Sequence, residues 1–234
     1  MTSEYHEVKT VADLASEPAE YREAITKIVI SHTVNELYGA QVFDEPAIAL
    51  APTPYAKWLT CRIAMEEYHH HVRFKALADD LQVPPEATDP KQKRPLSIFG
   101  FPMKSWPEFC VIKMLADLAE ILQVEDLLHC SFVPLRNIGR VTMPEEKFHA
   151  AFGKDFCTEL CKTEEGRAAV QRAIDDYAPY LPKFFGAAGS KNNETYRKYA
   201  LKARRNEQMR EDFLSRARSV VESLGLRFPE IAEA

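Results

Sequence analysis

The chain has 234 residues, 46% of them apolar and 28% charged, and its formal net charge is −5. This composition is typical of one soluble domain, and the acidic balance argues against nucleic-acid binding as the main function. No run of about 18 apolar residues is present, so we expect no membrane span. Residues 1–6 lack a basic flank and an apolar core, so we expect no signal peptide. Five cysteines without a Cys-x-x-Cys pair favour a reduced, cytoplasmic protein.

The chain begins with a polar segment, residues 1–17, which we expect to be loose or lightly helical. Apolar residues at helical spacing then predict six helices, at residues 18–43, 54–81, 107–130, 134–162, 163–185 and 194–224. Prolines punctuate the connection at residues 45–54. Pro144 lies inside the fourth predicted helix, where it either kinks the helix or marks its start.

The connection between the second and third helices is unusually long. Residues 83–107 contain six prolines and no sustained hydrophobic period. A long crossover of this kind is typical of ferritin-like four-helix bundles, in which the second and third helices run in the same direction. We therefore predict an all-α fold: one domain, residues 1–234, that consists of a ferritin-like bundle, a long crossover loop and additional C-terminal helices.

Two short motifs within the predicted bundle share one spacing. Glu67 precedes His70 by three residues, and Glu146 precedes His149 by three residues. On a helix these positions lie on the same face, where a carboxylate and an imidazole can bind one metal ion. Ferritin-like di-iron bundles combine two such motifs with one carboxylate from each of the other two helices.

The second helix offers a competing pair of residues, Glu66 and His69. The face that carries Glu67 and His70 is otherwise apolar, whereas Glu66 and His69 share a face with charged residues. We therefore expect Glu67 and His70 to point inward. In the fourth helix the choice is forced, since only Glu146 is followed by a histidine at this spacing.

The remaining two carboxylates are chosen by register and separation. Asp117 lies in an apolar stripe of the third helix, whereas Glu120 shares its face with Lys113, which is a poor core residue. The separation from Glu36 to Glu67 is 31 residues (67 minus 36), and that from Asp117 to Glu146 is 29 (146 minus 117). These near-equal separations favour a pseudo-two-fold site. In the first helix we choose Glu36 as the ligand, because Asp44 and the other acids lie too near the helix ends to face the middle of the bundle.

The full set is more informative than any of its members. Four carboxylates and two imidazoles buried without a metal ion would carry a large desolvation cost. We therefore predict a dinuclear metal site whose ligands and catalytic residues are Glu36, Glu67, His70, Asp117, Glu146 and His149. Oxygen and nitrogen donors without thiolates suit two iron ions, with manganese as an alternative.

With these residues in place, the chain resembles the phenylacetic acid catabolic protein family, and within it the di-iron subunits of phenylacetyl-CoA ring epoxidases. The resemblance is carried by residues 32–39, 51–70, 106, 111–117, 145–149, 184–186 and 213–229. It implies a non-haem di-iron mono-oxygenase that uses O₂ as co-substrate and inserts one oxygen atom into an aromatic or acyl substrate, such as a CoA thioester. It also implies a homologous structural subunit or a homo-oligomer as partner.

Alternatives remain open from the sequence. The same fold serves oxygenases that act alone on an amine or free acid, and ferritin-like proteins that handle iron or peroxide. The chain has no nucleotide-binding glycine motif and no Fe–S cysteine spacing, so we expect electrons from a separate reductase. Basic residues that could bind the phosphates of an acyl-CoA, or that could equally form a solvated helix face, are Lys191, Arg197, Lys198, Lys202, Arg204 and Arg205.

Overall fold

The computed structural model of the chain describes residues 5–92 and 96–231. Within these ranges the regular structure is helical, and the only bridge pairs Val8 with Phe132, so the all-α prediction is confirmed. The α-helices are α1 (Ala19–Gly39), α2 (Glu45–Leu50), α3 (Pro54–Asp80), α4 (Trp106–Leu127), α5 (Val133–Leu160), α6 (Glu164–Tyr177), α7 (Lys191–Lys198) and α8 (Asn206–Ser223). None of the described helices is long and apolar enough to span a membrane.

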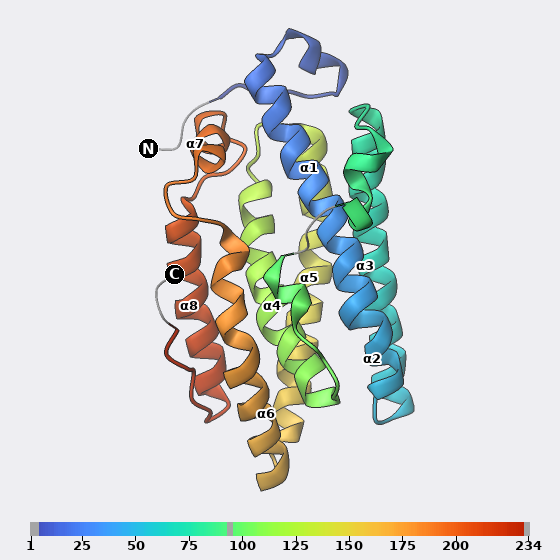
Figure 1. The fold of residues 1–234 in the computed structure, drawn as a ribbon, viewed down its shortest axis with the longest axis vertical. Coiled ribbons are helices and arrows are strands. Elements are labelled where there is room, and N and C mark those ends of the chain that lie inside the picture. The colour runs from blue at the N-terminus through green and yellow to red at the C-terminus, as the bar shows by residue number, and fades with distance from the viewer. Residues whose placement is uncertain (1–4, 93–95, 232–234) are drawn as a thin grey trace.

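Four long helices, α1, α3, α4 and α5, form the bundle, in which α1 pairs with α3 and α4 pairs with α5. Helix α4 lies near the middle of the molecule, with α6 and α8 beside it on the side away from α1 and α3 (Figure 1). Its apolar residues are buried around most of its circumference, because it faces the bundle on one side and the C-terminal helices on the other.

The first helix extends further than its sequence pattern indicates. After α1 the backbone forms a π-helical turn, Ala40–Asp44, and continues directly into α2. Pro46 is accommodated because it stands in the first turn of α2, where its missing N–H group would have no helical partner. The expected proline-punctuated connection of residues 45–54 is therefore wrong over most of its length, and Ala51–Thr53 forms the connection.

The crossover between α3 and α4 folds back over the bundle and contains three short 3₁₀ turns. The hydroxyl group of Tyr38 in α1 donates to the carbonyl oxygen of Pro90 at 2.5 Å, and the Phe99 ring stacks on Tyr38 at a centroid distance of 5.7 Å. Helix α4 starts where Glu108 accepts a hydrogen bond from the backbone N–H of Ser105 at 2.9 Å. The predicted loop thus closes over one side of the bundle.

Two predictions for the chain ends need correction. Residues 5–17 contain the 3₁₀ helix Ala12–Ser16, in agreement with the lightly helical alternative, but they are anchored rather than loose, because Val8 is buried and exchanges backbone hydrogen bonds of 2.9 Å with Ser131 and Val133. The single helix expected at residues 194–224 is divided into α7 and α8. Ala200 between them has a positive φ of 51°, and the Asp126 carboxylate accepts bonds from backbone N–H groups of the intervening loop.

Helix α5 is continuous through Pro144, so the alternative in which a helix starts there is wrong. Two apolar clusters flank the middle of the bundle. One lies around α4, α6 and α8, and the other joins the N-terminal segment to the first half of α1. The predicted polar site lies between them.

Gly153 permits the close approach of α5 to α4. A Cβ atom at this position would lie 2.3 Å from the Met114 backbone nitrogen and 2.6 Å from the Cys110 carbonyl oxygen. We expect Gly153→Ala to lower the free energy of unfolding by about 1–3 kcal/mol, because the backbones of the two helices must separate. Gly100→Ala is the matched control, since no atom lies within 4 Å of its Cβ position. Thermal unfolding monitored by circular dichroism checks this, and equal midpoints for the two variants would contradict it.

Candidate metal centre

All six residues predicted as ligands meet in the interior of the bundle, and each is buried. Their donor atoms form two sets, and within each set all atoms lie within 4.8 Å of one another. The first set consists of Glu36, Glu67, His70 and Glu146. The second set consists of Glu67, Asp117, Glu146 and His149. Two glutamates therefore belong to both sets.

Each shared glutamate directs one carboxylate oxygen toward each histidine. Glu67 has Oε2 3.7 Å from His70 Nδ1 and Oε1 3.1 Å from His149 Nδ1. Glu146 has Oε1 3.1 Å from His70 Nδ1 and Oε2 3.8 Å from His149 Nδ1. If two metal ions bind here, Glu67 and Glu146 would each contribute to holding both of them.

The opposite nitrogen of each imidazole faces a carboxylate from the neighbouring helix. His70 Nε2 lies 2.8 Å from Glu145 Oε2, and His149 Nε2 lies 2.9 Å from Glu66 Oε2. The acid that precedes the shared glutamate on one helix therefore orients the histidine of the other helix. Such partners hold a ligating imidazole in its tautomer and orientation. Arg73 in turn binds Glu145 at 2.6 Å.

These orienting acids were missed by the sequence reasoning, which treated Glu66 as a flanking residue on a solvated face. In the structure Glu66 is mostly buried, and Arg62 stabilises its charge at 2.9 Å. A signal was present, because both motifs begin with a Glu-Glu pair, at residues 66–67 and 145–146. Burial would raise the pKa of Glu145, but hydrogen bonds from His70 and Arg73 lower it to about 2.

Four buried atoms at the centre, His70 Nδ1, His149 Nδ1, Glu146 Oε1 and Asp117 Oδ2, make no well-aligned hydrogen bond, and their near polar neighbours are Lys113 and other members of the two sets. Buried polar atoms are rarely left without partners, because desolvation then goes uncompensated. These four point into the two sets, and all are nitrogen or oxygen donors. The donor set and its unpaired atoms therefore fit a pair of iron or manganese ions.

Lys113 contradicts the expectation that it is a poor core residue. Its side chain is only 3% exposed. Its ammonium nitrogen Nζ lies 2.7 Å from Glu67 Oε1, 3.0 Å from Asp117 Oδ2 and 3.1 Å from Asp44 Oδ1. Burial opposes the charge, but the carboxylates, Asp117 foremost, raise the pKa of Lys113 well above its ordinary value. Asp117 lies one turn along the same helix, but helix register cannot reveal the other two acids, Glu67 and Asp44, which other parts of the chain bring to Lys113.

Asp44 also lies where the sequence reasoning placed no inward acid. It is 2% exposed and ends the π-helical turn. A π-helical turn contains more residues than an α-helical turn, and it rotates the following residues relative to a regular helix. That rotation brings Asp44 to Lys113, so the expectation that it lies too near the helix end is wrong.

Glu120, the rejected alternative to Asp117, belongs to a separate group. It lies with His32 and Glu36, and His32 Nδ1 is 3.4 Å from Glu120 Oε1. Asp117, in contrast, groups with both shared glutamates. The preference for Asp117 agrees with this geometry.

A small cavity of about 60 Å³ adjoins the centre. Its polar wall is formed by residues of the centre, and its apolar wall includes Phe43, Ile98, Phe99, Ile112 and Phe184. Ile98 and Phe99 come from the crossover, so the long loop covers the site. A second cavity of about 220 Å³ shares the side chains of Asn35, Glu120 and Phe184 with the first, which makes it the neighbouring chamber toward α7.

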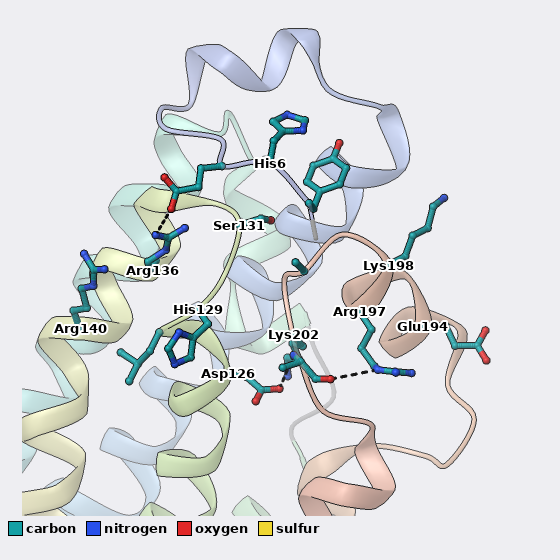
Figure 2. A pocket seen from close by; sticks show the side chains of 15 residues that line it. His6, Asp126, His129, Ser131, Arg136, Arg140, Glu194, Arg197, Lys198 and Lys202 are labelled. Atoms are coloured by element: carbon teal, nitrogen blue, oxygen red, sulfur yellow. Dashed lines mark hydrogen bonds and ion pairs between the residues drawn. The ribbon is translucent and has the colours of Figure 1, made fainter. Parts of the chain in front are cut away.

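A larger cleft of about 1330 Å³ opens at the end of the bundle near α7. Figure 2 shows Arg136 and Arg140 of α5 on one side, Arg197 on the other, and His129 and Lys202 between them. Of the six basic residues named from the sequence, Arg197, Lys198 and Lys202 line this cleft, and Lys191, Arg204 and Arg205 do not.

Comparison with known proteins agrees with the predicted fold. A solved structure described as a protein with aldehyde deformylating oxidase activity from Synechococcus superposes with a TM-score of 0.66 at 17% identity, covering 90% of this chain and 93% of that chain. The prediction of a ferritin-like fold is thereby confirmed.

The sequence comparisons are more specific. The chain is 26% identical over 220 residues to one of the subunits of 1,2-phenylacetyl-CoA epoxidase from Escherichia coli K12, covering 91% of this chain and 71% of that protein. Residues 8–234 match the family described as phenylacetic acid catabolic protein. The resemblance found from the sequence is confirmed, and the chain belongs to the phenylacetic acid catabolic protein family.

Proposed function

We propose that this protein is an O₂-dependent di-iron mono-oxygenase. The proposal rests on the two four-residue sets, which share Glu67 and Glu146. Each of these two glutamates directs one oxygen toward the histidine of the first set and its other oxygen toward the histidine of the second set. The curated relative belongs to an epoxidase, and the structural relative has oxidase activity, which supports oxidative chemistry. Two iron ions bound here would supply the activation of O₂ and the insertion of one oxygen atom into the substrate.

The protein's own residues perform the remaining tasks. Glu145 and Glu66 orient the two imidazoles, and four carboxylates supply negative charge that two divalent cations neutralise. The apolar wall of the adjoining cavity keeps water away from the centre and positions an apolar group beside it. An apolar wall of this kind favours oxidation of an organic substrate over the handling of iron or peroxide.

The two reducing electrons for each turnover require an external donor, so we propose a separate reductase as partner. The curated relative is one of several chains of its enzyme by its description, which supports a homologous structural chain as a second partner. We also propose the reduced, cytoplasmic setting that the cysteine pattern predicts, and the five cysteines are free thiols in the structure.

For the substrate we propose a CoA thioester whose phosphates bind in the cleft at the end of the bundle. Among the described residues no salt bridge joins Arg140 or Arg197 to a carboxylate: Arg140 bonds to Asn137, with Glu7 further away, and Arg197 bonds to the Ala203 carbonyl oxygen. Lys202 lines both the cleft and the neighbouring chamber, which in turn shares Glu120 with the cavity at the centre. The three hollows thus follow one another along α4.

The length of this path suits an extended substrate. Asp117 at the centre and Asp126 in the cleft are nine residues apart on α4 (126 minus 117), which corresponds to about 13.5 Å at roughly 1.5 Å per residue. An extended pantetheine arm is long enough to cover this separation. The acyl group would then lie beside the centre while the phosphates remain outside.

The shared glutamates allow a test of the metal site. We expect the wild-type chain to bind two Fe(II) ions and His70→Ala to retain one, because the second set remains complete. Glu146→Ala should bind neither ion tightly, because the residue belongs to both sets. Anaerobic titration with elemental analysis measures this, and Glu165→Ala, an exposed acid of α6, is the control. Only trace metal in the wild type, or two ions in Glu146→Ala, would contradict the proposal.

Metal binding should depend on pH. Burial would lower the pKa of His149, but hydrogen bonds that its imidazole donates to the carboxylates of Glu66 and Glu67 raise it to about 10. The metal-free imidazole therefore carries a proton at neutral pH, and an ion must displace it. We expect protons to be released on binding and affinity to rise with pH below that pKa. Calorimetry in buffers of different ionisation enthalpy measures the release, and an affinity that is independent of pH would argue against it.

The cleft can be tested without turnover. We expect Arg140→Ala and Arg197→Ala each to weaken the binding of CoA by roughly tenfold, because each removes a charge-assisted hydrogen bond to phosphate. Equilibrium dialysis with CoA measures this, and Arg172→Ala, an exposed arginine of α6, should leave binding unchanged. Unchanged binding in all three variants would place the phosphates elsewhere.

Turnover identifies the substrate. We expect Fe(II)-loaded protein, supplied with O₂, phenylacetyl-CoA and a surrogate reductant, to form a product that carries one additional oxygen atom. Glu145→Gln should reduce metal affinity or activity by about 10–100-fold, because His70 loses its orienting acid. Mass spectrometry of the product provides the measurement. An unmodified thioester, together with oxidation of a free acid or amine, would favour the alternative substrates.

A further inference from the structure

Lys113 places a buried positive charge on one side of the candidate centre only. The oxygen of Glu67 that it contacts is Oε1, which is also the oxygen that faces His149. Its second contact, Asp117, belongs to the same set as His149. In the described structure no ion pair joins Lys113 to Glu36 or His70, which distinguish the first set. The pseudo-symmetry of the six ligands is therefore broken by a seventh side chain.

We propose that Lys113 makes the two metal positions unequal, so that the first set, with Glu36 and His70, fills before the second set, with Asp117 and His149. The proposal rests on the dinuclear site proposed above and adds an order of filling to it. In the metal-free protein, the ammonium group holds two of the oxygens that the second position requires. A second ion can be bound only when those contacts are given up.

Asp44 provides the alternative partner for the displaced ammonium group. It belongs to neither set, it is buried, and its Oδ1 lies 3.1 Å from Lys113 Nζ. The ammonium group cannot reach solvent from its buried position, so it must stay beside the second ion with Asp44 as counter-charge. Two like charges at short range in a poorly solvated interior repel each other strongly. The affinity of the second position for its ion should therefore be lower by about tenfold or more. A tenfold difference corresponds to ~1.4 kcal/mol, which is small beside the repulsion between two buried like charges.

Unequal positions have a chemical consequence. A protein with two equivalent positions takes up two identical ions, whereas ordered filling permits a different metal at each position. The first position would select its ion with three carboxylates and one imidazole, of which only Glu67 contacts Lys113, through the oxygen that faces His149. The second would accept whichever ion competes best with an ammonium group.

Stepwise titration with Mn(II) tests the proposal without requiring activity. Electron paramagnetic resonance distinguishes an isolated Mn(II) ion from an exchange-coupled pair, and calorimetry gives the dissociation constant of each step. For the wild-type protein at one equivalent we expect isolated ions, with coupled pairs only when the second equivalent binds. In Lys113→Met the second dissociation constant should fall by at least about tenfold while the first is little changed.

Two further variants guard against a misleading result. Asp44→Asn keeps the lysine but removes its alternative partner, so the second step should become weaker rather than tighter. Lys154→Met removes an exposed lysine of α5 that lies outside both sets, and it should change neither step. If Lys113→Met fails to fold, the opposite shift in Asp44→Asn still supports the proposal.

The outcomes separate this proposal from the one on which it rests. Equal affinity for both ions in the wild type would overturn the ordered filling and leave the dinuclear site intact. The same conclusion follows if Lys113→Met and Asp44→Asn both keep the wild-type ratio of the two steps. Failure of the wild type to bind Mn(II) or Fe(II) would instead overturn the metal site itself.

Discussion

Four carboxylates converge in the interior between α1, α3, α4 and α5, and their mutual repulsion is the constraint that the surrounding structure must balance. Each buried acid is costly unless an opposite charge or a donor compensates it. The protein supplies two imidazoles, one ammonium group and, further out, Arg62 and Arg73 on the orienting acids. The atoms left without partners mark where two cations would complete the balance.

The remainder of the fold holds these charges in place. Apolar clusters lie on either side of the centre, so the polar groups cannot relax toward solvent without disrupting the packing of α4. The crossover covers the centre through Ile98 and Phe99, and the contact of Gly153 with the α4 backbone sets the spacing between the two helices that carry Asp117 and Glu146. Helix packing, loop closure and metal chemistry therefore depend on one another. The proposed reaction is consistent with this arrangement, since an apolar cavity beside the proposed metal pair would suit the oxidation of an organic group.

Two buried charged residues, Lys113 and Asp44, stabilise each other beside the centre. Lys113 lies on a buried helix face, where lysine is rarely expected, and Asp44 lies at a helix end, where no inward acid was expected. The charges compensate each other, because Lys113 Nζ lies 3.1 Å from Asp44 Oδ1. A buried ion pair is weak evidence for stability. In the described part of the chain, the Lys113–Asp44 pair contacts only members of the second set of ligands, so we infer that its role is to make the two metal positions different.

The helical fold, the long crossover and the six residues that meet at the centre could all be predicted from the amino-acid sequence. This was possible because helical periodicity and the repeated spacing of Glu and His are local properties of the chain. The contacts of Glu66 with His149 and of Glu145 with His70 are visible only in the folded chain, because they join residues 83 and 75 positions apart. The inward turn of Asp44 likewise depends on a π-helical turn that has no signature in the apolar pattern. Lys113 was misjudged for the same reason: register shows the direction of a side chain, whereas its stability depends on the charges that other helices bring to it.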